Sequence, residues 1–197
     1  MRAFLFVLLV LASFGTSALT AQDSKKIEET GKSPVVAKVA SGGKVRMDLC
    51  SSGVELVGHD EDTLRVSYEH ERGDVNVRIR VSGDRADVDV RGCPHNNFKL
   101  RVEIPKSSAL YIRMFAGDLN VRDIVGDKDV ELHFGQVSMD VGKAEEYRRV
   151  SASVNSGEIN APAFNVSKGG LFRSFNQSGS GKYLLHAHVG AGELDLR

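Results

Sequence analysis

Two histidines stand two residues apart near the end of the chain, in the run Leu185-His186-Ala187-His188. If this run is an extended strand, His186 and His188 project from the same side and offer two imidazole ligands. A transition metal normally takes three or four ligands, and His133 could complete such a set only if its strand is aligned with theirs. Two solvated histidines are the simpler interpretation, so we predict no bound metal and no cofactor.

The chain has two cysteines, Cys50 and Cys93, which enclose a loop of about 43 residues. An even number of cysteines in an exported chain predicts a disulfide, and closing a loop of this length is worth on the order of 4 kcal/mol in the chain-entropy description. Two buried free thiols are the alternative. A catalytic thiol is disfavoured because neither cysteine has an evident activating base or helix start beside it.

Catalytic motifs are missing from the sequence. The run from Asn176 to Tyr183 resembles a phosphate loop but has asparagine in place of the first glycine and tyrosine in place of the metal-binding hydroxyl. Acidic residues recur in the chain, at Asp118, Glu158, Glu193 and Asp195. A pair of carboxylates can cleave glycosides, but this recurrence is what a solvent-facing repeat position predicts. We therefore predict a protein that is not an enzyme.

One short phrase occurs five times with little change, and it predicts the elements that carry these residues. A glycine is followed by a polar residue and then by alternating apolar and small polar residues, starting at Gly73, Gly117, Gly135, Gly157 and Gly192. Alternation of this kind is typical of a strand with one buried face. Only glycine takes positive φ without a steric cost, so each glycine is predicted to form a corner.

Period-two alternation continues from Gly43 almost to the end of the chain, with turn residues every eight to twelve positions. Valines, leucines and isoleucines share one face in most of these segments, and Val130, Leu132 and Phe134 are one example. Helix is nearly absent, so the fold is predicted to be all-β. The recurring phrase favours a right-handed β-solenoid, or β-helix-like stack of short strands, with hairpins in the N-terminal half.

The first 21 residues have the three regions of a signal peptide: a basic start, an apolar run and a small-residue cleavage site. Export to the periplasm or the extracellular space is therefore expected, with no transmembrane segment in the mature chain. Residues 22–40 are predicted to form a flexible leader that ends in a short edge strand at Val35–Ala37, and residues 41–197 a single domain. The 26 basic and 26 acidic residues are interleaved, which disfavours a nucleic-acid partner.

These features together resemble a bacterial family of adhesin-like proteins with β-strand repeats, a domain of unknown function found in exported envelope proteins. The resemblance covers residues 41–197 and rests on the phrase Val102-Glu-Ile-Pro105, the strand Ala109-Leu-Tyr-Ile-Arg113 and the glycine phrases that follow. The chain departs from the family in one respect. Members often have a Ser-Gly pair at the start of the phrase, and here only Ser156-Gly157 is such a pair. The resemblance implies an elongated β-solenoid body and an adhesive or scaffolding role.

The expected function is an exported, non-enzymatic interaction module that binds an unidentified protein or polysaccharide of the cell envelope. A carbohydrate-active β-helix enzyme and a small metal- or ligand-sensing module are the alternatives. The last strand ends without an evident cap, so we expect an exposed sheet edge for a partner at Leu194 and Leu196.

Overall fold

The computed structural model describes residues 26–69, 75–92 and 98–197, apart from the side chains of residues 50–52. These residues form an all-β structure, as predicted. Two single 3₁₀ turns, η1 (Ala144–Glu146) and η2 (Pro162–Phe164), interrupt the strands. The strands are β1 (Ile27–Gly31), β2 (Val35–Lys38), β3 (Lys44–His59), β4 (Thr63–Tyr68), β5 (Asn76–Ser82), β6 (Arg85–Arg91), β7 (Lys99–Pro105), β8 (Ala109–Arg122), β9 (Lys128–Met139), β10 (Tyr147–Ala161), β11 (Val166–Ser178) and β12 (Tyr183–Leu196).

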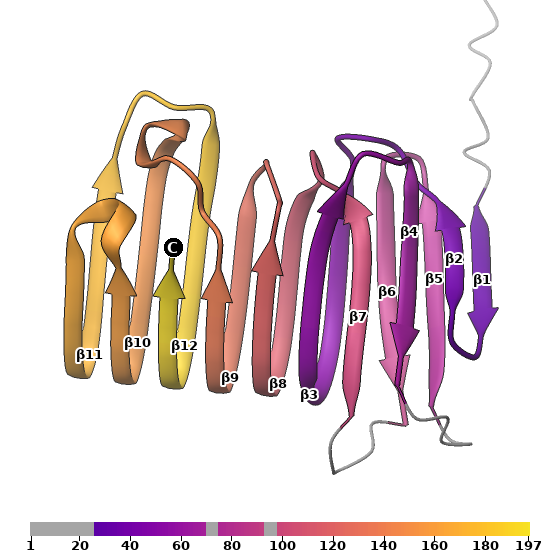
Figure 1. The fold of residues 1–197 in the computed structure, drawn as a ribbon, viewed down its shortest axis with the longest axis horizontal. Helices are drawn as coiled ribbons and strands as arrows, with labels where there is room; N and C mark the ends of the chain where they lie inside the picture. The colour runs from indigo at the N-terminus through magenta and orange to yellow at the C-terminus, as the bar shows by residue number, and fades with distance from the viewer. Residues whose placement is uncertain (1–25, 70–74, 93–97) are drawn as a thin grey trace, which may run out of the picture.

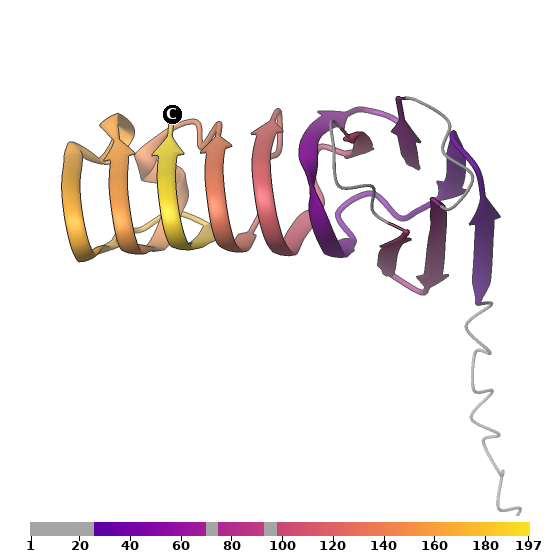
Figure 2. The same cartoon turned by 90° about the horizontal axis from the view of Figure 1, so that it is seen from below.

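Six of the strands are long and bend back on themselves near their middle. These are β3, β8, β9, β10, β11 and β12, with 12 to 16 residues each. Figure 1 shows them side by side as a row of U shapes with all the bends at one edge. Seen from below in Figure 2, the bends connect two facing layers. Each bent strand contributes one limb to each layer. Pairing runs through both limbs of neighbouring strands.

Stacked glycines make the bends possible. Gly117, Gly135, Gly192 and Gly157 lie opposite one another in successive strands, and each has a positive φ between 119° and 144°. A Cβ at Gly135, Gly157 or Gly192 would overlap the carbonyl oxygen of the next glycine in the column. The backbones therefore approach too closely for any other residue. These four predicted corners are confirmed, and Gly170 of β11 joins the column with φ 117°.

The bend also shifts the phase of the alternation. In β9 the last inward residue before the bend is Leu132 and the next is Val137, a step of five residues instead of two. The same step separates Val189 from Leu194 in β12. Residues within the step lie on the bend edge, so Phe134, which simple alternation places in the core, is 53% exposed. The core itself is a set of apolar columns between the two layers.

The order of the stack is not the order of the chain. The bent strands follow one another as β3, β8, β9, β12, β10 and β11, and those from β3 to β10 are parallel. The C-terminal strand β12 therefore lies between β9 and β10, as the label C in Figure 1 shows. Leu194 and Leu196 are fully buried in it. The expected partner edge at these two leucines is wrong, because β12 is hydrogen-bonded on both sides.

Beyond β3 the two layers continue as separate short strands. One layer continues through β6, β5 and β1, and the other through β7, β4 and β2. β5 and β6 form the antiparallel hairpin expected in this half, but β3 pairs in parallel with β6 and β7. The strand β2 lies where a short strand was expected at the end of the leader, whereas β1 lies in the part predicted to be flexible, so the sheet begins at Ile27.

Several predictions fall outside the described residues. They are the signal peptide, the corner at Gly73 and the bridge between Cys50, whose side chain is not described, and Cys93. Within the described residues, no helix is long and apolar enough to cross a membrane.

Candidate functional site

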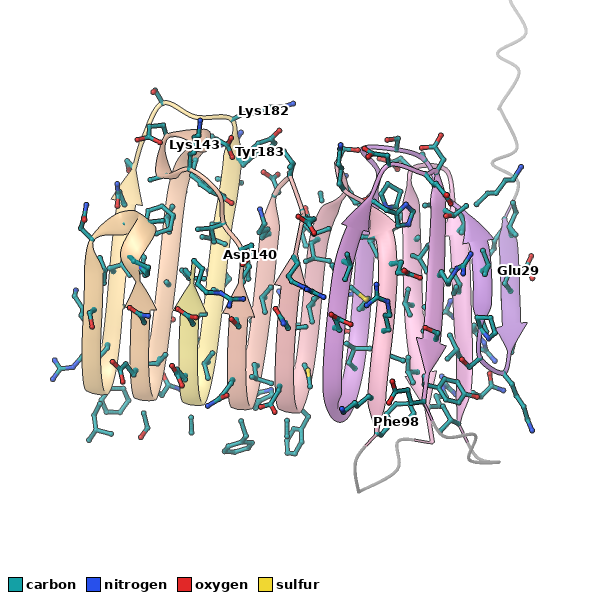
Figure 3. All side chains as sticks on the ribbon, viewed as in Figure 1. Glu29, Phe98, Asp140, Lys143, Lys182 and Tyr183 are labelled. Atoms are coloured by element: carbon teal, nitrogen blue, oxygen red, sulfur yellow. The ribbon has the colours of Figure 1, made fainter. Side chains whose placement is uncertain are left out.

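The bend edge carries a row of exposed apolar side chains, which we call the bend ridge: Phe115, Phe134, Leu171 and Phe172. Their exposed fractions are 58%, 53%, 64% and 79%. Most of the other large apolar side chains in the described residues are buried in the core. Figure 3 shows side chains projecting below the row of bends, at the edge opposite to Lys182 and Tyr183. Exposed apolar side chains gathered along one edge mark an interaction surface.

The two ends of the bend ridge differ from its middle. At one end the ring of Phe115 packs edge-on against that of Phe134, with centroids 5.6 Å apart, and lies 5.8 Å from the ring of His133. In the next two strands the position of Phe134 is taken by Ala191 and Ser156, which are small. At the other end Leu171 occupies this position on β11. The bend ridge is therefore saddle-shaped: large apolar side chains stand at its two ends, and the small side chains of Ala191 and Ser156 lie between them.

Phe172 is held in a strained conformation. Its φ is 50°, in the left-handed region that bulky residues rarely enter. This strain costs about 1–3 kcal/mol, and the ring, which is 79% exposed, contributes little burial to offset it. Such positions are retained where function requires them, which supports a binding role for the bend ridge.

A line of carboxylates runs beside the bend ridge on one of the two layers. This carboxylate row consists of Asp118, Glu193 and Glu158, each directly after its corner glycine, with Gln136 at the equivalent position of β9. Glu193 and Glu158 are opposite one another on adjacent strands, and like charges so placed repel. Glu193 accepts a hydrogen bond from Gln136 Nε2 at 3.2 Å. None of the three carboxylates is paired with a cation among the described residues.

Several charges elsewhere on the outer faces are paired. Arg101 Nη1 lies 2.6 Å from Glu55 Oε2, and Arg122 also pairs with Glu55. Arg85 Nη2 lies 2.6 Å from Asp87 Oδ1 on the far part of the sheet. The carboxylate row differs from these pairs, because its negative charge is not compensated within the described chain.

The histidines do not form the cluster that the sequence suggested. His188 Nδ1 lies 2.8 Å from Ser153 Oγ on β10. His133 is on the bend edge against Phe115. His186 faces Asp129 and Glu131 of β9 instead, and the three possible ligand atoms lie within 4.8 Å of one another.

Arg113 occupies the other side of these two carboxylates. Its guanidinium lies 3.2 Å from Asp129 Oδ1 and 3.0 Å from Glu131 Oε2. Both carboxylates therefore have a counter-ion from the chain itself, and the cluster with His186 forms a surface ion-pair network.

A hollow of about 670 Å³ lies on the outer face where β3 meets β7 and β8. Its floor includes Gly53, whose neighbours in register are Lys99 and Asp118. Arg101 and Glu55, which pair with each other, form another part of its wall. The lining includes several charged side chains and the hollow is open to solvent, unlike the enclosed pocket of a typical small-molecule site.

A lysine is buried inside the stack. Lys128 is 2% exposed, and its Nζ donates to the hydroxyl of Tyr147 at 2.8 Å and to the carbonyl of Gly126 at 3.3 Å. The Tyr147 hydroxyl donates in turn to the carbonyl of Val141 at 2.8 Å. Burial lowers the pKa of Lys128 to about 8, against a smaller raising effect of Glu146. Burial also raises the pKa of Tyr147.

The free edge of the bent stack is β11, and inward-pointing cations close it. Lys168 is the residue of β11 at the end of one apolar column of the core, which consists of Val54, Leu119, Val137, Leu194 and Ile159. Arg173 is at the end of a second column, which includes Leu132, Val189 and Val154. Lys168 Nζ donates to the carbonyl of Ser174 at 2.9 Å, and Arg173 Nε to that of Gly169 at 2.8 Å. Inward charges of this kind protect an edge strand against further pairing.

Sequence reasoning missed the bend ridge, Lys128 and the cap on β11. The five-residue step between buried residues, visible at Leu132 and Val137, was the signal for the bend ridge, because it marks the residues between as edge residues. Lys128 lies in phase with Val130 and Leu132, so its inward position follows from alternation despite its charge.

Comparison with known proteins gives the chain no family. No family model matches it, and no curated protein matches it in sequence. It is similar in structure to a protein of Clostridium sporogenes ATCC 15579 described as a "putative cell adhesion protein", with 12% sequence identity and a TM-score of 0.48. The match covers 87% of this chain and 99% of that one. At this distance the likeness assigns no function to the chain.

Proposed function

We propose that this chain is an exported, non-enzymatic interaction module of the cell envelope, adhesin-like in role, built as a right-handed β-solenoid. Its binding surface is the bend edge. The observation that carries the proposal is the bend ridge, where Phe115, Phe134, Leu171 and Phe172 stand exposed on a closely stacked core. A rigid support lowers the entropic cost of binding, because the side chains are already in place.

The design of the two edges supports this role. The free edge at β11 is closed by Lys168 and Arg173, which disfavours strand addition there. The bend edge instead keeps the four large apolar side chains of the bend ridge exposed to solvent. A protein that protects one edge and leaves apolar groups on another is suited to binding through the second.

The test is saturable binding to isolated cell envelopes, measured by co-sedimentation of labelled purified protein. We expect binding that saturates and is displaced by excess unlabelled protein. Binding that rises linearly and resists displacement would reject the interaction role. The same incubations are assayed for release of soluble sugars, because turnover abolished by changing a single carboxylate would favour the enzyme alternative instead.

Export has a separate test that uses the two cysteines. Expression of the full-length chain should give a mature protein that begins at Gln22 and is recovered outside the cytoplasm. In that protein Cys50 and Cys93 should resist maleimide labelling until a reductant is added, because an oxidising compartment favours the bridge. Labelling of both thiols without reductant would contradict the predicted bridge, and an unprocessed cytoplasmic chain would contradict export.

A further inference from the structure

The charge and shape of the bend edge indicate what kind of partner it binds. The bend ridge runs across the strands from β8 to β11, and the carboxylate row runs beside it from β8 to β10, ending at Gly169 of β11. One line supplies apolar contact and the other supplies negative charge that is unpaired within the described chain. A complementary partner must therefore present an apolar stripe with a line of positive charge beside it.

We propose that the bend edge binds a basic amphipathic helix of a partner protein. A helix of this kind carries an apolar stripe along its axis, with lysines or arginines on the flank, which reproduces the two parallel lines. Four strand spacings separate β8 from β11, or about 19 Å at about 4.8 Å each. A helix of about 13 residues spans this length at about 1.5 Å per residue.

The contacts follow from the saddle shape of the bend ridge. The helix lies along the saddle, over Ala191 and Ser156, where small side chains leave room for its backbone. Its apolar residues pack against Phe115 and Phe134 at one end and against Leu171 at the other. Its basic flank faces the carboxylate row and relieves the repulsion between the two glutamates.

This inference rests on the proposed interaction role and names the chemistry of the partner. Its test uses an 18-residue helical peptide with a leucine stripe and lysines on the remaining positions, labelled for fluorescence anisotropy. Two companion peptides serve as controls: one with glutamate in place of lysine, and one with the same lysines and leucines in scrambled order. We expect binding of the first peptide and at least about tenfold weaker binding of both others.

Variants of the protein locate the site. Phe115→Ser with Phe134→Ser should weaken binding of the lysine peptide at least about tenfold, since central aromatic contacts dominate such interfaces. Glu158→Gln with Glu193→Gln should weaken it about three- to tenfold at low salt. At about 0.5 M salt this second effect should shrink, because exposed charges are screened.

Matched variants elsewhere on the surface serve as controls. Val36→Ser with Val125→Ser removes two exposed apolar side chains outside the bend edge, and Glu61→Gln with Glu145→Gln removes two exposed carboxylates. Neither pair should change the affinity by more than about twofold, within ordinary surface effects. These positions are exposed, apart from the half-buried Glu193, and unchanged circular dichroism confirms that each variant is folded.

Three results in these assays would overturn the proposal. One is an equal loss of lysine-peptide affinity in the bend-edge and control variants, and another is equal affinity for the lysine and glutamate peptides. The third is binding to vesicles with an anionic lipid, dependent on Phe115 and Phe134, by a protein that does not bind the lysine peptide. Envelope binding that survives the Phe115 and Phe134 changes would refute the bend-edge site while leaving the interaction role intact. If the unmodified protein binds the lysine peptide but does not bind envelopes, the interaction role alone is refuted.

Discussion

Replacing Lys128 with methionine should stabilise the protein at neutral pH and remove most of the dependence of its stability on pH between 7 and 9.5. Lys128 stands between Leu110 and Leu185 in neighbouring strands, in a column that is otherwise mainly apolar. Methionine has a similar length and no charge, so it fills the same space without the cost of burying an ammonium group.

The magnitude follows from the pKa of Lys128, which burial lowers from 10.5 to about 8. Between these two values the unfolded chain binds a proton that the folded chain has released, so the free energy of unfolding rises with pH. At about 1.4 kcal/mol per pH unit, the rise from pH 7 to pH 9.5 is about 2 kcal/mol. Tyr147, whose pKa is raised, has the opposite effect, but only above pH 10, where the unfolded tyrosine ionises.

The gain at neutral pH is smaller than the full cost of burial. The penalty on the charged lysine is about 3 kcal/mol, but methionine also loses the hydrogen bonds to Tyr147 and Gly126. The Tyr147 hydroxyl keeps its bond to the carbonyl of Val141. We therefore expect Lys128→Met to raise the free energy of unfolding at pH 7 by about 1–2 kcal/mol.

Urea unfolding at pH 7.0 and pH 9.5 is the measurement, followed by far-UV circular dichroism because the chain has no tryptophan. The matched control is Lys44→Met, which removes an exposed lysine and should leave the pH dependence of the wild type unchanged. The reasoning is refuted if the wild type is equally stable at both values of pH, or if Lys128→Met keeps the wild-type slope.

Two further predictions concern the bends and the cap. Gly135→Ala should lower the free energy of unfolding by about 3 kcal/mol or more, because it combines a positive φ with a Cβ that overlaps the Gly117 carbonyl. Gly83→Ala is its control, since Gly83 has a positive φ but open space around it, and equal losses in urea unfolding would argue against the stacked corner. Replacing Lys168 and Arg173 together with valine should cause concentration-dependent association through β11, seen in sedimentation velocity. Sedimentation identical to that of the wild type at every concentration would show that these cations do not protect the edge.

The sequence predicted the corners and most of the core because both depend on local physics. A recurring glycine before an alternating strand predicts positive φ, and Gly117, Gly135, Gly157 and Gly192 all have it. Gly170 escaped prediction because its surroundings, Lys-Gly-Gly-Leu-Phe, lack the alternating phrase.

The order of the strands could not be predicted because the bent strands are chemically alike. The strands β8, β9, β12 and β10 each present a stacked corner glycine and mainly apolar inward residues, so several orders would bury the same columns. The position of β12 between β9 and β10 is decided by cross-strand neighbours and by the polar cap on β11, which makes β11 the terminal strand. The expected edge at Leu194 failed for this reason.

The place of β12 in the stack has a consequence for synthesis on the ribosome. Among the described strands, β10 pairs only with β11 and β12, so translation of β10 and β11 yields a hairpin without a strand partner in the earlier part of the chain. The hairpin joins the rest when Tyr183–Leu196 has emerged and inserted beside β9. The two halves of the stack therefore join only through β12, and a premature stop codon before residue 183 would leave two unjoined halves instead of a shorter stack.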